Sequence, residues 1–109
     1  TVVSLHVTDT AIGDRAVVSV EGVVDLSSLG TLQDALARTI QRHPGRVVTV
    51  DLDGVTAIDD CGLGILLGAA ATARRSGGDL DLVVGEGPVR RRLEQTRLDK
   101  AVDVRATIS

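Results

Sequence analysis

The chain has 109 residues, a formal net charge of −3 and no Phe, Tyr, Trp or Met. This length suits one domain, over residues 1–109, whose single core must be aliphatic throughout. The negative charge and the lack of aromatic side chains exclude an ordinary nucleic-acid binder. No uncharged run reaches the roughly 17 to 25 residues of a membrane-spanning helix, so we expect no membrane insertion.

Cysteine usage and basic residues bear on the cellular setting. Cys61 is the only cysteine, so the chain forms no internal disulfide and needs no oxidising compartment. Lys100 is the only lysine beside many arginines, which is typical of GC-rich bacterial genomes. No targeting segment is evident. We therefore expect a cytoplasmic bacterial protein.

The chain opens with the pattern of a hairpin. Val3, Leu5 and Val7 alternate with polar residues, which predicts a strand with one covered face. The turn signal Gly13-Asp14 then leads into a second apolar run over residues 16–23. Two antiparallel strands are the expected result.

A helix should follow this hairpin. Ser27 or Ser28 suits its N-cap, and Pro44-Gly45 should end it. Between them the apolar residues fall on one helical stripe, made of Leu29, Leu32, Leu36 and Ile40.

The middle of the chain predicts a central strand and a second helix. Residues 47–52 carry too many branched apolar side chains to leave either face in water, and this strand should end near Gly54. The helix should span residues 61–75, with carboxylates at its start, arginines at its end and Gly77-Gly78 beyond.

The last third adds a strand over residues 80–84, a helix that opens at Pro88 and a short strand over residues 102–104. The predicted order is β-β-α-β-α-β-α-β. Strands that alternate with helices through short connections indicate an α/β fold: a mixed, mainly parallel sheet of four to five strands with helices packed against it.

The most distinctive text lies in residues 47–68, where a strand and the Gly54-Val55 pair lead to a helix start. That start reads Ile58-Asp59-Asp60-Cys61-Gly62-Leu63-Gly64. Weaker matches flank it at Gly22-Val23-Val24-Asp25, at Gly77-Gly78 and at Pro88-Val89-Arg90-Arg91 followed by Leu98-Asp99-Lys100. In this order the segments resemble the STAS domain of bacterial anti-sigma factor antagonists.

The resemblance implies a regulatory module that binds a kinase-type anti-sigma factor and so controls release of a sigma factor. It implies no catalytic activity and no cofactor. The partner would contact the segment over residues 55–63 and the nearby turn at Asp25. The implied contact residues are Asp25, Thr56, Asp59, Asp60, Cys61, Gly62 and Leu63.

The resemblance also implies a switch position at the helix start. In such relatives a serine or threonine after the first Asp of the motif is phosphorylated by the partner, which ends binding. Asp60 stands there, so phosphorylation at this position is chemically excluded. A carboxylate imitates only in part a phosphoserine, which carries about 1.5 to 2 negative charges. The alternative role for Asp60 is that of a helix cap.

Two departures from the family pattern stand out. Arg97 occupies the position where relatives often have Gly before the Leu-Asp pair, so we expect the third helix to close differently. The family's C-terminal helix has no counterpart before Ser109 and is expected to be absent or cut off.

Enzymatic and metal-binding readings are weaker. Carboxylates beside Cys61 disfavour the ionised thiolate that a nucleophile needs. Nothing in the sequence indicates that His6 or His43 lies near Cys61 to act as its base. The acids Asp51, Asp53, Asp59 and Asp60 read as solvated loop carboxylates, because the chain lacks the acidic pair that a metal-dependent receiver domain has after its first strand. We expect neither an enzyme nor a metal site.

Two surface segments leave alternatives open. Residues 90–92 are three arginines, read as the solvated face of a helix. The second helix has apolar or small residues on every side, so part of it should meet a neighbouring helix, a partner protein or a second copy. A homodimer is one possibility, and an accessory STAS subunit of a stress-sensing complex or lipid-transport system is the alternative function.

Overall fold

The computed structural model describes residues 5–107. Val3, which was expected in the first strand, lies outside these residues. In chain order the elements are β1 (Leu5–Ile12), β2 (Arg15–Val24), α1 (Leu29–Arg42), β3 (Val47–Ile58), α2 (Asp60–Arg75), β4 (Asp79–Val83), α3 (Pro88–Gln95), α4 (Leu98–Ala101) and β5 (Asp103–Arg105).

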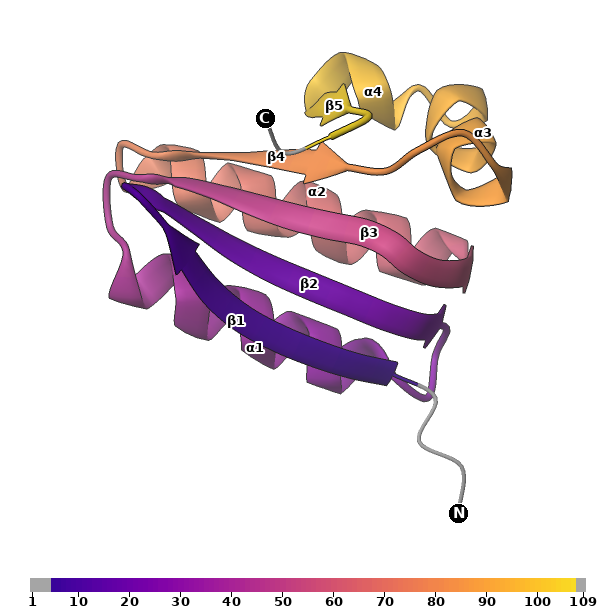
Figure 1. Ribbon diagram of the computed structural model, residues 1–109, viewed down its shortest axis with the longest axis horizontal. Helices are drawn as coiled ribbons and strands as arrows, with labels where there is room; N and C mark the ends of the chain where they lie inside the picture. The colour runs from indigo at the N-terminus through magenta and orange to yellow at the C-terminus, as the bar shows by residue number, and fades with distance from the viewer. Residues whose placement is uncertain (1–4, 108–109) are drawn as a thin grey trace.

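The strands form one mixed sheet in the order β1-β2-β3-β4-β5, in which only the β1–β2 pair is antiparallel. Gly13, with φ of 60°, lies in the turn of this opening hairpin. Helices α1 and α2 lie side by side against one face of the sheet, while α3 packs against β3 and α4 contacts α2 and β5 (Figure 1). The predicted α/β fold with a mainly parallel sheet is confirmed.

An aliphatic core fills the space between the sheet and the two long helices. Val48, Val50 and Leu52 of β3 are fully buried, as is Leu66 of α2. Strand β3 lies between β2 and β4, which confirms that it is central. Within residues 5–107 no helix is long and apolar enough to cross a membrane.

Strand β3 is longer than predicted. It continues through Gly54 to Ile58, so the Gly54-Val55 pair lies inside a strand and the expectation that the strand ends near Gly54 is wrong. The β2–β3 register shifts here, because two residues of β3 lie opposite one residue of β2 between the pairs Ser19–Asp51 and Glu21–Gly54, as in a bulge of β3. A Cβ on residue 54 would lie 2.6 Å from Glu21 Cγ. Glycine thus allows the strand to pass this crowded point.

The connection after α3 contains the short helix α4, which was not predicted. Arg97 precedes it in the left-handed region, with φ of 62°. Its N–H donates to Glu94 O at 3.1 Å, and its carbonyl accepts from Lys100 N at 3.1 Å. The arginine therefore adopts the backbone conformation that glycine adopts without steric cost.

Candidate functional site

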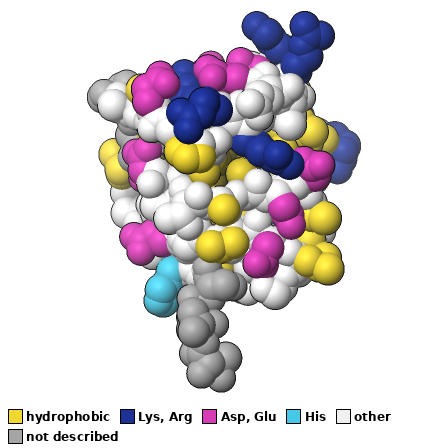
Figure 2. All heavy atoms as spheres, turned by 90° about the vertical axis from the view of Figure 1, so that its right-hand side faces the viewer, with side chains coloured by type: hydrophobic (Ala, Val, Ile, Leu, Met, Phe, Trp, Pro, Cys, Tyr) yellow, Lys and Arg dark blue, Asp and Glu magenta, His cyan; other side chains and the backbone are white. Residues whose placement is uncertain are grey.

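The candidate site lies where β2 and β3 end and α2 begins. Asp59 N–H donates to Val24 O at 3.1 Å, which joins the two strand ends at the helix start. Figure 2 shows this end of the molecule: acidic side chains are spread over it, basic side chains gather in its upper part and hydrophobic side chains are exposed between them.

Asp59 is the N-cap of α2. Its backbone is extended, and its side chain accepts a hydrogen bond from Gly62 N at 3.1 Å. This bond satisfies one of the free N–H groups of the first turn. The capping role that the sequence allowed for Asp60 therefore belongs to its neighbour.

Asp60 is the first residue of α2 and points outward. Its side chain is 81% exposed, and one carboxylate oxygen lies 2.5 Å from the Arg92 guanidinium of α3. A cation of the same chain thus already partners the Asp60 carboxylate. This position of Arg92 was not anticipated.

The three arginines of α3 do not form a uniformly solvated face. Arg90 is half-buried and donates to Val84 O at 2.9 Å. Arg92 is half-buried beside Asp60, and only Arg91 is exposed. The expectation for residues 90–92 is wrong, because Arg90 binds the carbonyl of Val84 after β4 and Arg92 lies beside the end of β3 and Asp60.

Gly62 and Leu63 support the site from beneath. Both are buried, and a Cβ on residue 62 would lie 2.4 Å from Val24 Cγ1 and 2.9 Å from Ile58 Cγ1. Glycine therefore lets the helix start approach the strand ends closely. These two residues position the helix and offer a partner no side chain.

The turn after β2 holds Asp25, the third acid of the site, in a fixed position. Asp25 Oδ1 accepts from Ser27 Oγ at 2.6 Å and from Ser27 N at 3.0 Å. The bond from the Ser27 hydroxyl, joined by the backbone bonds, lowers the pKa of Asp25. Ser28 Oγ accepts from Asp25 N and donates to Val23 O, each at 3.0 Å. Ser28 thus holds this turn and does not cap α1 with its side chain, contrary to expectation.

Sequence reasoning missed two apolar features of this end. Leu26, at the tip of the turn, is 76% exposed. A hollow of about 170 Å³ lies between the end of β3 and the start of α3. It is lined by Thr56, Ala57, Ile58, Pro88, Val89 and Arg92. A leucine inside a polar turn was a usable sequence signal, whereas the hollow depends on how α3 packs.

Five of the expected contact residues are at least partly accessible and form one patch. Thr56, Asp60 and Cys61 are exposed, and Asp25 and Asp59 are half-buried. Within residues 5–107, Cys61 makes no hydrogen bond to a histidine and no cluster of acids, histidines or cysteine is arranged to hold a metal. The patch offers carboxylates and apolar surface for contact with another molecule.

Comparison with known proteins shows which family and fold the chain matches. The family model described as "Mlab, STAS domain" matches residues 7–106. The crystal structure of an anti-sigma factor antagonist from Mycobacterium paratuberculosis is 25% identical, with a TM-score of 0.88. The match covers 96% of this chain and 88% of that chain.

Two structures of SpoIIAA, an anti-sigma factor antagonist, share the fold at lower identity. The unphosphorylated form is 15% identical, with a TM-score of 0.77, over 94% of this chain and 90% of that one. The phosphorylated form, from Bacillus, is 16% identical, with a TM-score of 0.69, over 94% and 93%. Because the family model spans nearly the whole chain, this protein belongs to the STAS domain family.

Proposed function

We propose that this STAS domain is a regulatory protein-binding module of the anti-sigma factor antagonist class. It binds a kinase-type anti-sigma factor in the bacterial cytoplasm, controls the release of a sigma factor and catalyses no reaction of its own. Support comes from the family, from the fold shared with an anti-sigma factor antagonist and from the exposed patch at the start of α2.

The observation that carries the proposal is the placement of Asp60. Its carboxylate is 81% exposed at the start of α2, where the family resemblance locates the regulated serine or threonine. A fixed negative charge there resembles the phosphorylated, non-binding state more than the unmodified one. Asp60 therefore weakens binding to the anti-sigma factor, and no kinase can change this setting.

The contact surface would combine charge and apolar anchors. Asp25 and Leu26 lie on the β2–α1 turn, next to the hydrogen bond from Asp59 N to Val24 O, and Arg92, the partner of Asp60, lines the hollow beside Thr56. The exposed Leu26 and the hollow are suitable anchors, because interface energy concentrates in a few well-packed side chains. The carboxylates would select a partner with basic residues opposite them.

The test is calorimetric titration of one kinase-type anti-sigma factor from the same genome with wild type and Asp60→Ser. We expect the serine variant to bind about tenfold more tightly, which corresponds to about 1.4 kcal/mol. The matched control is Asp34→Ser, which removes an exposed carboxylate from α1. Weaker binding by Asp60→Ser, or an equal gain in the control, would reject the charge-mimic role.

A second function, an accessory STAS subunit of a larger assembly, is favoured by one observation. A carboxylate at position 60 needs no kinase as its partner. Affinity capture from the source cell distinguishes the two: recovery of an anti-sigma factor supports the first function, and recovery of stress-sensing or transport subunits supports the second.

A further inference from the structure

A hollow of about 420 Å³ lies between α1 and α2. The two helices lie side by side and run in the same direction, because each connects two parallel strands of the sheet (Figure 1). Gln33 and Gly64 therefore line the hollow toward the amino ends of the helices, and Ile40 and Arg75 line it toward their carboxyl ends. Its volume falls within the range of about 300 to 1,000 Å³ that small-molecule sites occupy.

The walls of the hollow are aliphatic. Leu36 and Ile40 of α1 are buried beneath it, and Ile65 and Ala69 of α2 are half-buried along it. No aromatic ring is present to stack on a flat ligand, since the chain has none. The walls therefore suit a molecule that buries aliphatic surface along the two helices.

Two glycines of α2 keep the hollow open. A Cβ on Gly64 or Gly68 would meet no atom within 4 Å, so close packing inside the chain does not require either glycine. Glycine inside a helix is less stable than alanine, so both positions weaken α2. A larger side chain at either position would extend into the open space and reduce the volume of the hollow.

Arg75 is the only charged residue that lines the hollow. It is one of three arginines in the last turns of α1 and α2, and the other two, Arg42 and Arg74, each pair with an aspartate. Arg75 donates to Thr72 Oγ1 at 3.0 Å, and within residues 5–107 no carboxylate lies in ion-pair range of it. Its guanidinium therefore has donors for an anion at one end of an aliphatic hollow.

We propose that this hollow binds an unbranched aliphatic carboxylate, a fatty acid of medium chain length. The hydrocarbon chain lies between α1 and α2 and covers Leu36, Ile40 and Ile65. The carboxylate accepts hydrogen bonds from the Arg75 guanidinium, a charge-assisted contact that is stronger than one between neutral groups. None of the expected partner-contact residues lines the hollow, so this proposal and the proposed function are independent.

The first experiment is titration of the purified chain, without any partner, followed by amide chemical shifts. Decanoate is the main probe, and we expect saturable binding with the largest shifts at Gly64, Gly68 and Arg75. Octanoate, which is shorter by two methylene groups, should bind about tenfold more weakly. Decanol and decyltrimethylammonium carry the same chain without the anion and should also bind about tenfold more weakly.

Two outcomes of this titration would overturn the proposal. The absence of saturable decanoate binding would show that the hollow takes no fatty acid. Equal affinities for decanoate, decanol and decyltrimethylammonium would show that only the chain is recognised and that Arg75 selects no head group.

The second experiment uses variants to place the ligand. Arg75→Gln should weaken decanoate binding about tenfold and leave decanol binding unchanged, because only the charged head group contacts the arginine. The matched control is Arg91→Gln, which removes an exposed arginine of α3 that does not line the hollow. Decanoate affinity equal to that of wild type in Arg75→Gln would overturn the proposal.

Gly68→Leu tests the place of the chain. This variant should fill the hollow and abolish binding of both decanoate and decanol. Gly30→Leu is its matched control, because residue 30 is exposed on α1, has equal free space and lies outside the hollow. A circular dichroism melt checks that each variant is folded, and Arg75→Gln still decides the matter if Gly68→Leu does not fold. Undiminished decanoate binding by folded Gly68→Leu would place the ligand elsewhere and overturn the proposal.

Discussion

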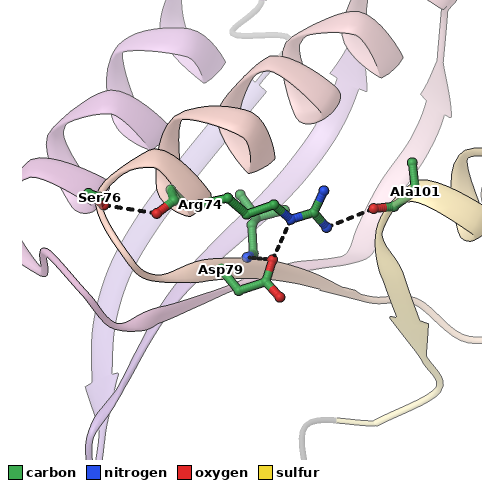
Figure 3. Close-up of polar contacts among 6 residues, drawn as sticks. Arg74, Ser76, Asp79 and Ala101 are labelled. Atoms are coloured by element: carbon green, nitrogen blue, oxygen red, sulfur yellow. Dashed lines mark hydrogen bonds and ion pairs between the residues drawn. The ribbon is translucent and has the colours of Figure 1, made fainter.

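The two ends of α2 use charge in different ways. At the carboxyl end, Arg74 Nε donates to Asp79 Oδ1 at 2.9 Å and Arg74 NH2 donates to Ala101 O at 2.7 Å (Figure 3). At the amino end, Asp60 makes a single ion pair and leaves most of its carboxylate in solvent. One end joins three segments of the chain, while the other presents a charge outward.

The difference teaches that favourable helix charges need not have the same role. Acids at the start and arginines at the end both suit the helix dipole, and the sequence predicts them equally. Only the contacts distinguish them: Arg74 is bound by β4 and α4, whereas Asp60 reaches one side chain on α3. The contacts at the carboxyl end stabilise the fold, and the exposed charge at the amino end belongs to the surface for which we propose recognition.

The largest expected effect on stability comes from adding a methyl group to a glycine near each end of α2. A Cβ on Gly78 would lie 2.2 Å from Arg46 O, a backbone atom, whereas a Cβ on Gly62 would meet the side chains of Val24 and Ile58. Side chains can shift more easily than backbone. We expect Gly78→Ala to lower the unfolding free energy by about 3 kcal/mol and Gly62→Ala by about 1 to 2 kcal/mol. Urea denaturation measures both, and a greater loss for Gly62→Ala would contradict this.

The next effect concerns the cap at the amino end. Asp59→Ala removes the bond to Gly62 N and should cost about 1 kcal/mol of unfolding free energy. Asp59→Asn retains an acceptor and is the control, with a smaller loss. Chemical denaturation of the two variants gives the comparison, and equal losses would show that charge, not the cap bond, carries the effect.

The sequence predicted the architecture because its signals are local. The strands, the long helices and the Pro88 helix start follow from hydrophobic period, caps and turn residues. One miss is long-range and the other is an unusual local conformation. Strand β3 continues past Gly54 because an extra residue of β3 is accommodated opposite β2, and α4 follows a left-handed Arg97. Neither has a periodic signature.

The candidate site was predicted only in part, for the same reason. The motif locates Asp59 and Asp60 together, but it does not tell which one caps the helix. The ion pair of Asp60 with Arg92 joins residues 32 positions apart and depends on the packing of α3. Burial separates Gly62 from the exposed residues beside it, and no residue type announces that difference.

A smaller effect appears at acid pH at the carboxyl end. Bonds from Leu80 N and then from Arg74 lower the pKa of Asp79 below its ordinary value of 3.8. A lowered carboxyl pKa stabilises the fold above the unfolded pKa, and this stabilisation is lost as pH falls through the folded one. We expect Asp79→Asn to cost under about 1 kcal/mol at pH 7, because the side chain is half exposed.

The pH series supplies its own control. Unfolding free energies of wild type and Asp79→Asn should converge as pH falls below about 4 and the wild-type carboxylate is protonated. Asp14→Asn, which alters an exposed turn carboxylate, gives the background change with pH. A difference between wild type and Asp79→Asn that stays constant at acid pH would show that shape, not charge, explains it.

The smallest expected effect is at the amino end, in the pair of Asp60 and Arg92. Both side chains are substantially exposed, so water screens the attraction even though the contact is short. A double-mutant cycle of Asp60→Ser, Arg92→Ala and the combined variant should give a coupling energy of about 0.2 to 1 kcal/mol. Urea denaturation at low and high salt measures it, and the coupling should fall as salt rises. The corresponding Arg74–Asp79 cycle should give a larger value, because that arginine also binds a backbone carbonyl. A coupling of 2 kcal/mol or more at Asp60, insensitive to salt, would instead make this acid a structural residue like those at the other end of the helix.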